Sequence, residues 1–201
     1  ARVFLGLGKD FGASAGLKSA SLSGTRVASN DEMEFNLAAQ KQWSNDDWER
    51  ITLGPTFKFQ RFDRNLSKFT LGHGGYFSPQ QLFKYGGELT ALTREQRDFV
   101  VQGKVNFGYQ QHQEDCAPLL PLESNLCSEF YTNNKVGGMY LGLELLGMVQ
   151  TDPHAQLGGG VFYGLSPEFN EFGFMLAVRL TLDPRRSVLT ADLPDWINTI
   201  R

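Results

Sequence analysis

The chain has 201 residues, 41% of them hydrophobic, and its 19 Lys and Arg against 22 Asp and Glu give a net charge of −3. This length predicts one domain or two small ones, and the near-neutral balance argues against a nucleic-acid partner, which requires a basic surface. The 16 Phe, 6 Tyr and 3 Trp residues exclude a disordered chain. The best candidate for a membrane-spanning helix, Gly137–Val149, contains Glu144 and is shorter than the ~18 apolar residues such a helix needs.

Apolar and polar residues alternate along most of the sequence. In Phe99–Gln110 the odd positions are mostly apolar and the even positions mostly polar, as in a strand with one face of each kind. Glycines inside the apolar segments disfavour helices, by about 1 kcal/mol each. We therefore predict an all-β antiparallel protein of about nine strands. The predicted strands fall in Arg2–Gly8, Gly12–Gly24, Glu32–Gln40, Arg50–Gln60, Phe83–Ala91, Phe99–Gln110, Val136–Val149, Gln156–Gly164 and Phe172–Leu182.

Short and long connections alternate between these segments. The expected short turns are Gly8–Phe11, Ser44–Asp47, Thr93–Arg97 and Thr151–His154. The expected longer loops are Thr25–Asp31, Arg61–Gln81, Gln111–Lys135 and the modest Leu165–Glu171. A transmembrane β-barrel has this asymmetry, with apolar side chains outward, polar side chains inward, and short turns on one side of the membrane only. A soluble antiparallel sheet is the alternative that the pattern leaves open.

The most distinctive segment is Phe62–Gln80, which reads FDRNLSKFTLGHGGYFSPQ. It resembles the C-terminal region of the bacterial cellulose synthase operon protein C family, and the similarity extends over about residues 1–184. The resemblance implies a barrel in the outer membrane of a Gram-negative bacterium, surrounded by lipid, that secretes cellulose or a related glucan. It also implies periplasmic tetratricopeptide repeats, N-terminal to the barrel, that contact the inner-membrane synthase machinery.

The family's barrel has about sixteen strands, whereas this chain offers about nine. Ala1 leads directly into an apolar segment, so either a leader has been removed or the chain is a piece of a longer protein. We expect the second: residues 1–182 as the C-terminal part of the barrel and 183–201 as a tail, in the periplasm or inside the pore. A self-contained barrel of eight strands is the alternative; its interior is filled by side chains and passes no polymer.

The polar faces of the predicted strands supply the candidate lumen residues. These are Lys18, Glu32, Glu34, Arg50, Lys58, Gln60, Lys84, Glu88, Gln102, Lys104, Asn106, Tyr140, Glu144, Gln156 and Arg179. Both signs of charge occur in similar number, whereas an ion-selective pore carries a one-sided ring of charge. A neutral, hydrated glycan fits such a lining; the alternative is that the charges only brace the barrel wall.

Two loops carry further candidates. We consider Gly72–Gln80, with His73, Tyr76 and Phe77, as a gate whose aromatic rings stack on sugars, or simply as a Gly-rich turn. Cys116 and Cys127 lie in one loop and suggest a disulfide that stabilises it by roughly 2–3 kcal/mol, with two free thiols as the alternative. The spacing of His112, Glu114, Asp115 and Cys116 is not that of a metal site, and we expect no metal and no cofactor.

Enzymatic motifs are weak. The Gly6–Gly12 segment has dinucleotide-loop glycines, but no helix pattern follows them. We therefore expect no enzyme but an outer-membrane pore for cellulose export by passive conduction. The alternatives are export of another exopolysaccharide, general diffusion of solutes, or a small structural barrel that anchors without transport.

Overall fold

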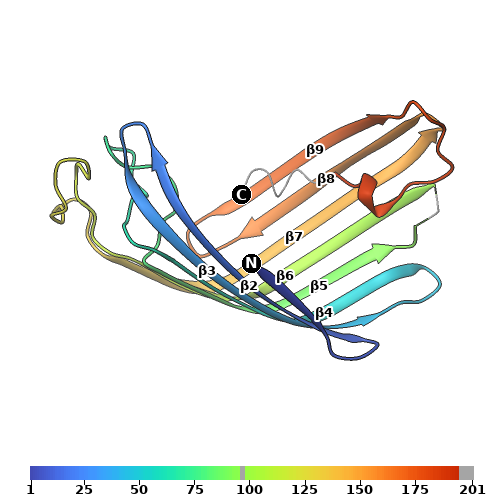
Figure 1. The fold of residues 1–201 in the computed structure, drawn as a ribbon, viewed down its shortest axis with the longest axis horizontal. Helices are drawn as coiled ribbons and strands as arrows, with labels where there is room; N and C mark the ends of the chain where they lie inside the picture. The colour runs from blue at the N-terminus through green and yellow to red at the C-terminus, as the bar shows by residue number, and fades with distance from the viewer. Residues whose placement is uncertain (96–97, 195–201) are drawn as a thin grey trace. The chain divides into compact units, whose positions relative to one another are not determined.

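The computed structural model describes residues 1–95 and 98–194 and consists of nine β-strands and one turn of 3₁₀ helix (Figure 1). The strands are β1 (Arg2–Gly6), β2 (Phe11–Gly24), β3 (Val27–Trp43), β4 (Trp48–Phe62), β5 (Gln81–Thr93), β6 (Phe99–Glu114), β7 (Asn134–Asp152), β8 (Ala155–Leu165) and β9 (Asn170–Leu180). The 3₁₀ turn spans Thr190–Asp192, and the described residues contain no α-helix.

All nine strands belong to one sheet in which each strand pairs with its neighbours in sequence, from β1 to β9. The pairing is antiparallel, with Arg2 opposite Gly16 in β1–β2 and Glu144 opposite Phe162 in β7–β8. Within the described residues β1 and β9 are not paired, so the sheet is open. The predicted all-β antiparallel class is confirmed, and the sheet is consistent with part of a β-barrel.

No helix among the described residues is long and apolar enough to cross a bilayer.

The expected long connection at Thr25–Asp31 is wrong, because β2 and β3 are joined by Thr25 and Arg26 alone. Arg26 adopts a left-handed conformation with φ 62°, as tight turns require. The polar run after it continues as strand because a distant loop supplies partners: Asn30 Nδ2 donates to the carbonyl of Arg64 and Asn30 Oδ1 accepts from its N–H, both at 2.9 Å. Strict alternation of short and long connections therefore fails here.

The other long loops are close to expectation, at residues 63–80 and 115–133, and the last one shrinks to 166–169. The turns 44–47 and 153–154 fall inside the predicted short segments. The turn predicted at Thr93–Arg97 includes Gln96 and Arg97, which lie outside the described residues. The strands that flank the two long loops, β4 to β7, extend further toward those loops than the sequence pattern indicated.

The chain divides into two compact units. The first comprises residues 1–39, 55–86 and 108–139, and contains both long loops. The second comprises the described residues of 40–54, 87–107 and 140–201. Its small hydrophobic core consists of Leu92, Val100, Met148 and Val188 with Leu193 packed against them, so the segment after β9 supplies part of the core.

A close backbone approach in the first unit requires glycine at Gly108 of β6. A Cβ at this position would lie 2.2 Å from the carbonyl oxygen of Tyr85 and 2.6 Å from the Cα of Gly86. Backbone atoms paired in a sheet cannot move aside as a flexible side chain can. Gly103 of the same strand differs, since the nearest atom to its Cβ would be Leu145 Cδ1 at 4.0 Å.

The substitution Gly108→Ala should therefore lower the free energy of unfolding by about 3 kcal/mol, the upper range for overpacking. Gly103→Ala is the matched control and should leave it unchanged within about 0.5 kcal/mol. Urea unfolding of the purified protein measures both. Equal effects of the two substitutions would contradict the close approach of Gly108 on β6 to the backbone of β5.

Candidate functional site

The two faces of the sheet differ in chemistry, as β9 shows most clearly. Its apolar side chains Phe172, Phe174, Leu176, Val178 and Leu180 are 70 to 83% exposed. The intervening residues, from Glu171 to Arg179, are half-buried. We call the first side the apolar face and the second the polar face, and extend the names to the other strands by their alternation. A soluble sheet buries its apolar face against a second layer; here that face is open.

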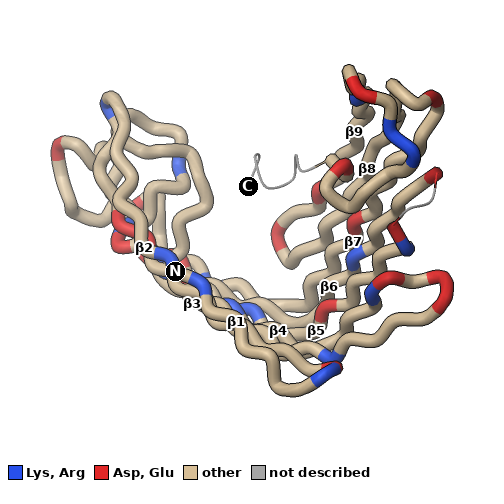
Figure 2. The backbone as a smooth tube through the Cα atoms, turned by 45° about the vertical axis from the view of Figure 1, so that its right-hand side comes forward, with Lys and Arg blue, Asp and Glu red and all other residues tan. Residues whose placement is uncertain are grey.

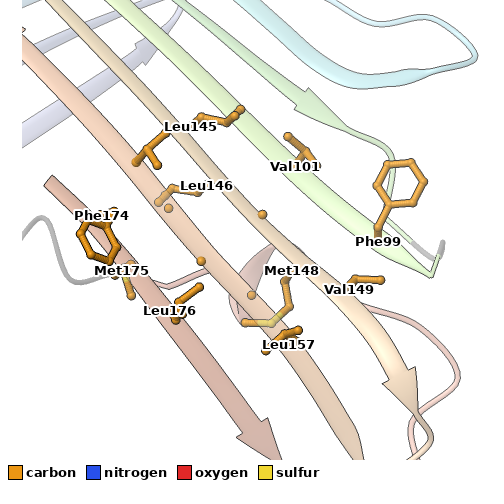
Figure 3. Close-up of a pocket in the computed structure, with 15 residues that line it drawn as sticks. Phe99, Val101, Leu145, Leu146, Met148, Val149, Leu157, Phe174, Met175 and Leu176 are labelled. Carbon is orange, nitrogen blue, oxygen red and sulfur yellow. The ribbon is translucent and has the colours of Figure 1, made fainter. Parts of the chain in front are cut away.

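The apolar face of the second unit contains a groove of about 640 Å³ (Figure 3). Gly147 and Gly159, which lack side chains, form part of its lining, together with Phe99, Val101 and Leu176. The labelled side chains in Figure 3 carry only carbon and methionine sulfur beyond the backbone. This surface offers no hydrogen-bonding side chain to water and suits contact with an apolar medium.

The polar face of the first unit is a network of paired charges. Lys18 Nζ lies 2.8 Å from Glu32 Oε2, and Gln60 Nε2 donates to Glu32 Oε1 at 2.8 Å. One step along β3, Lys58 Nζ lies 2.9 Å from Glu34, which also accepts from Asn36 Nδ2 at 2.6 Å. Adjacent strands therefore place opposite charges in register, which neutralises them.

The polar face of the second unit repeats this arrangement. Lys104 Nζ on β6 lies 3.0 Å from Glu88 Oε2 on β5. Asn106 lies over Gly142 of β7, where an added Cβ would be 2.4 Å from Asn106 Oδ1. Figure 2 shows that β8 and the middle of β9 carry no Lys, Arg, Asp or Glu. The charged part of this face thus lies on β5–β7 and at the ends of β9.

The structure brings most predicted lumen residues together in pairs. Lys18, Glu34, Lys58, Glu88, Lys104 and Arg179 each form an ion pair. Lys84, Tyr140 and Glu144 are half-buried on the polar face, whereas Arg50 is exposed near the start of β4. The pairs are what a braced wall would also show, so lumen contact with a ligand stays a prediction.

The loop at residues 63–80 holds two of its three gate candidates firmly. His73 is 7% exposed, with Nε2 2.9 Å from the carbonyl oxygen of Pro118. The Tyr76 hydroxyl accepts a hydrogen bond from Asn30 Nδ2 at 3.1 Å. Phe77 is 45% exposed, and its ring meets the buried His112 edge-on at 5.0 Å between centroids. Of the three, Phe77 offers the most open surface for a ligand.

The glycines of this loop have a structural role. Gly72 has φ +96°, and a Cβ there would lie 2.9 Å from the Pro121 ring. Gly75 has φ +67° and lies against the Phe69 ring. Both positions combine a left-handed backbone with close contact, which a side chain would disturb. The Gly-rich motif is therefore needed to pack the loop, whatever else it does.

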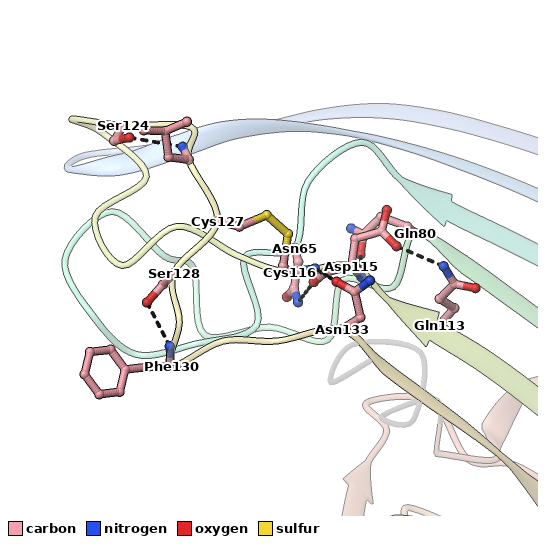
Figure 4. The surroundings of a disulfide bond; sticks show 11 residues. Asn65, Gln80, Gln113, Asp115, Cys116, Ser124, Cys127, Ser128, Phe130 and Asn133 are labelled. Atoms are coloured by element: carbon pink, nitrogen blue, oxygen red, sulfur yellow. Dashed lines mark hydrogen bonds between the residues drawn. A yellow bond between two sulfur atoms is a disulfide. The ribbon is translucent and has the colours of Figure 1, made fainter.

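A disulfide between Cys116 and Cys127 lies in the neighbouring loop, at residues 115–133 (Figure 4). The N–H of Cys116 donates to Asn133 Oδ1 at 2.7 Å, which fixes the start of the loop to its end. Asn65 Nδ2 donates to the carbonyl of Asp115 at 2.8 Å and so ties the two long loops together. The loops at residues 63–80 and 115–133 therefore pack together in the first unit.

The segment after β9 folds over the polar face of the second unit, and the sequence pattern did not predict this. Val188 is fully buried in the hydrophobic core. The Asp192 carboxylate, 1% exposed, binds the guanidinium groups of Arg179 and Arg185 and accepts from the Leu189 N–H at 2.9 Å. Asp183–Pro194 is thus docked; Asp195 and Trp196 of the predicted tail lie outside the described residues.

The charge state of this docked segment follows from its contacts. Burial by itself would raise the pKa of Asp192, but the Leu189 N–H and the guanidiniums of Arg185 and Arg179 outweigh it and lower that pKa. The pKa of Glu95 is lowered by the side-chain hydrogen bond from Thr190 and by the bond that the Thr190 N–H donates to it at 2.8 Å. Both carboxylates are therefore ionised at neutral pH and hold the segment in place.

Within residues 1–95 and 98–194, no group of three or more His, Cys, Asp and Glu side chains is arranged to hold a metal ion.

The family model for the C-terminus of cellulose synthase operon protein C matches residues 1–183. The chain belongs to this family. It is 26% identical to the cellulose synthase operon protein C of Xanthomonas axonopodis pv. citri over 194 residues. It is also 26% identical to the cellulose synthase 2 operon protein C of Komagataeibacter xylinus over 189 residues. The resemblance predicted from Phe62–Gln80 is confirmed.

The matched region is a small part of these relatives. The alignments cover 86 and 87% of this chain but 13 and 14% of the two relatives. A third relative, from Pseudomonas fluorescens, is 31% identical over 52% of this chain and 8% of its own length. The chain therefore matches the family's C-terminal region and spans less than one sixth of the length of these relatives.

The substitution Asp192→Asn should release the docked segment, because it removes the charge that Arg179 and Arg185 share. A loss of about 2 kcal/mol, typical of hydrogen bonds to a charged group, corresponds to about thirtyfold faster cleavage after the exposed Arg186 by trypsin. Asp183→Asn, in the exposed part of the same segment, is the control and should not change the rate.

Docking should also depend on pH. The pKa of Asp192 is lower in the folded protein than its ordinary value of 3.8. The ionised Asp192 therefore stabilises the docked segment fully above pH 3.8, and this stabilisation is lost as the pH falls through the lowered pKa. Cleavage by pepsin should therefore reach the segment only in strong acid in the wild type. Cleavage of wild type and Asp192→Asn by trypsin at equal rates at neutral pH would contradict this account.

Proposed function

We propose that the chain is the C-terminal part of an outer-membrane pore that exports cellulose or a closely related β-glucan by passive conduction. The observation that carries the proposal is the two-faced sheet: an exposed apolar face backed by a polar face of paired charges. Membership in the cellulose synthase operon protein C family supplies the polymer class. The pore does no chemistry; synthesis at the inner membrane drives the chain outward.

The open apolar face supports a membrane location. Strands of a barrel in a bilayer turn apolar side chains to lipid and polar ones to the lumen, and every backbone group must be paired. In the full-length protein β1 and β9 would pair with further strands and close the barrel. The two long loops, at residues 63–80 and 115–133, then lie outside the cell together with the short β2–β3 and β8–β9 connections. The turns at the other ends of the strands lie in the periplasm, on the side of the periplasmic repeats and the synthase.

The pairing of charges supports a neutral cargo. Each of Glu34, Glu88 and Glu32 has a lysine within 3.0 Å, so the polar face offers little net charge to a passing ion. A diffusion pore selective for ions carries unpaired charge of one sign at its narrow part. Hydroxyl groups of a glucan can exchange hydrogen bonds with paired side chains at little cost.

The proposal predicts that full-length protein in a planar bilayer conducts ions with weak selectivity and that soluble cello-oligosaccharides block the current. Lys104→Glu should shift selectivity toward cations, because it places two carboxylates together on the polar face. The double exchange Glu88→Lys with Lys104→Glu should restore the original selectivity. Lys9→Glu, in the turn between β1 and β2, is the control for added charge and should have no effect.

Other outcomes would identify the competing functions. Current without any block by glucan oligomers would indicate general solute diffusion. Block by a different polymer alone would indicate another exopolysaccharide. Absence of current from correctly inserted protein would indicate a structural anchor.

A further inference from the structure

A polar cavity of about 350 Å³ lies in the first unit, where the start of β3 meets the two long loops. Its volume is within the ~300–1,000 Å³ that is typical of ligand pockets. Three segments line it: β3 with Val27, Ala28 and Ser29, the first long loop with Arg64, and the second with residues 121–125. Unlike the apolar groove of the second unit, this cavity includes charged residues in its lining.

The three segments that form the cavity are joined by contacts around Gly72. The carbonyl of Gly72 accepts a hydrogen bond from the Ala28 N–H at 2.8 Å, which ties its loop to β3. A Cβ at Gly72 would lie 2.9 Å from Pro121 Cγ, so the absence of a side chain lets the second loop come close. Asn30 adds two hydrogen bonds to the backbone of Arg64, both at 2.9 Å. The walls are thus in place before a ligand arrives, which lowers the entropic cost of binding.

Two opposite charges line this cavity without pairing. Arg64 and Glu123 are both exposed, and neither side chain forms an ion pair with any residue that the structure describes. Ser29 and Asn125 also line the cavity, and their side chains form no hydrogen bond within residues 1–95 and 98–194. The polar face of the sheet differs, because its lysines and glutamates lie within 3.0 Å of one another. The cavity therefore offers a cationic donor, an anionic acceptor and two neutral polar groups to a ligand.

We propose that this cavity binds a short saccharide segment, with Arg64 and Glu123 as its main hydrogen-bonding residues. A hydroxyl group is both a donor and an acceptor, so neighbouring sugar hydroxyls accept from the guanidinium and donate to the carboxylate. The C–H groups of a sugar ring suit the apolar Val27 and Leu122 in the same lining. Saccharide binding itself does not depend on the proposed pore function; only the position of the cavity outside the cell rests on it.

The combination of charges disfavours other ligands. A phosphate ion is attracted by Arg64 but repelled by Glu123, and for a divalent cation the two effects are reversed. An acyl chain would bury both charges without partners. A neutral ligand rich in hydroxyl groups satisfies both residues. Two sources can supply it at the cell surface: the glucan chain that leaves the pore, and the sugar portion of a glycolipid in the outer leaflet.

The test is isothermal titration calorimetry of the purified full-length protein with two probes, cellotetraose and the lipid-free core oligosaccharide of lipopolysaccharide. Binding of the first identifies the exported chain as the ligand, and binding of the second identifies a glycolipid. Arg64→Gln and Glu123→Gln should each weaken the binding by about tenfold, the lower range for a hydrogen bond to a charged group. Both side chains are exposed, so neither substitution disturbs the packing of the loops.

The matched controls remove the same charges close to the cavity but outside its lining. Arg61→Gln changes an exposed arginine at the end of β4, three residues before Arg64. Glu129→Gln changes an exposed glutamate in the same loop as Glu123. Both variants should bind the saccharide as the wild type does. Their behaviour separates a contact with the ligand from a general effect of the protein's charge.

Three results would overturn the saccharide site. These are a wild type that binds neither probe, saccharide binding that Arg64→Gln and Glu123→Gln leave unchanged, and binding of inorganic phosphate that only Arg64→Gln abolishes. Block of the ion current in planar bilayers reports on the pore separately. Block that persists in Arg64→Gln would leave the pore function standing without this site, and saccharide binding by a protein that carries no current would leave this site standing without the pore.

Discussion

The alternation of side chains along each strand is the constraint on which the rest of the structure depends. Successive residues of β9 fall on opposite faces, so that Phe174 and Leu176 are exposed while Met175 between them is half-buried. A shift of one residue in register would reverse both faces. Charged residues on the apolar face, such as Lys41 and Glu49, lie near strand ends, so the charges in the middle of the strands fall on the polar face, which has to accommodate them.

The polar face meets this requirement in two ways. Across the middle of the strands, lysines and glutamates on neighbouring strands pair directly, as Lys58 does with Glu34. At the end of β9, the chain turns back and brings Asp192 to Arg179, so that a segment after the last strand completes the charge balance. Elsewhere on this face glycines make room for their neighbours: a Cβ at Gly173 would lie 2.2 Å from Phe162 Cε1.

The sequence was sufficient to predict the strands, because a period of two is a local signal. It failed at Thr25–Asp31, where the polar residue Asn30 reads as loop but continues β3 by bonding to Arg64, far along the chain. The docking of Val188 and Asp192 was missed for the same reason. Their partners lie on strands β5–β9, and no pattern in the neighbouring sequence indicates these distant contacts. The position of Phe162 on the polar face could have been predicted, since Phe162 lies an even number of residues from Gln156 on the same strand.

The central claim is that the apolar face contacts lipid and the polar face lines water, and single cysteines along β9 of the full-length protein test it most directly. In membranes, a water-soluble maleimide should label cysteines at Gly173, Met175 and Ala177, and a membrane-confined reagent should label those at Phe174, Leu176 and Val178. Labelling should alternate at every residue. Water-soluble labelling of consecutive positions, or of the apolar positions alone, would contradict the account.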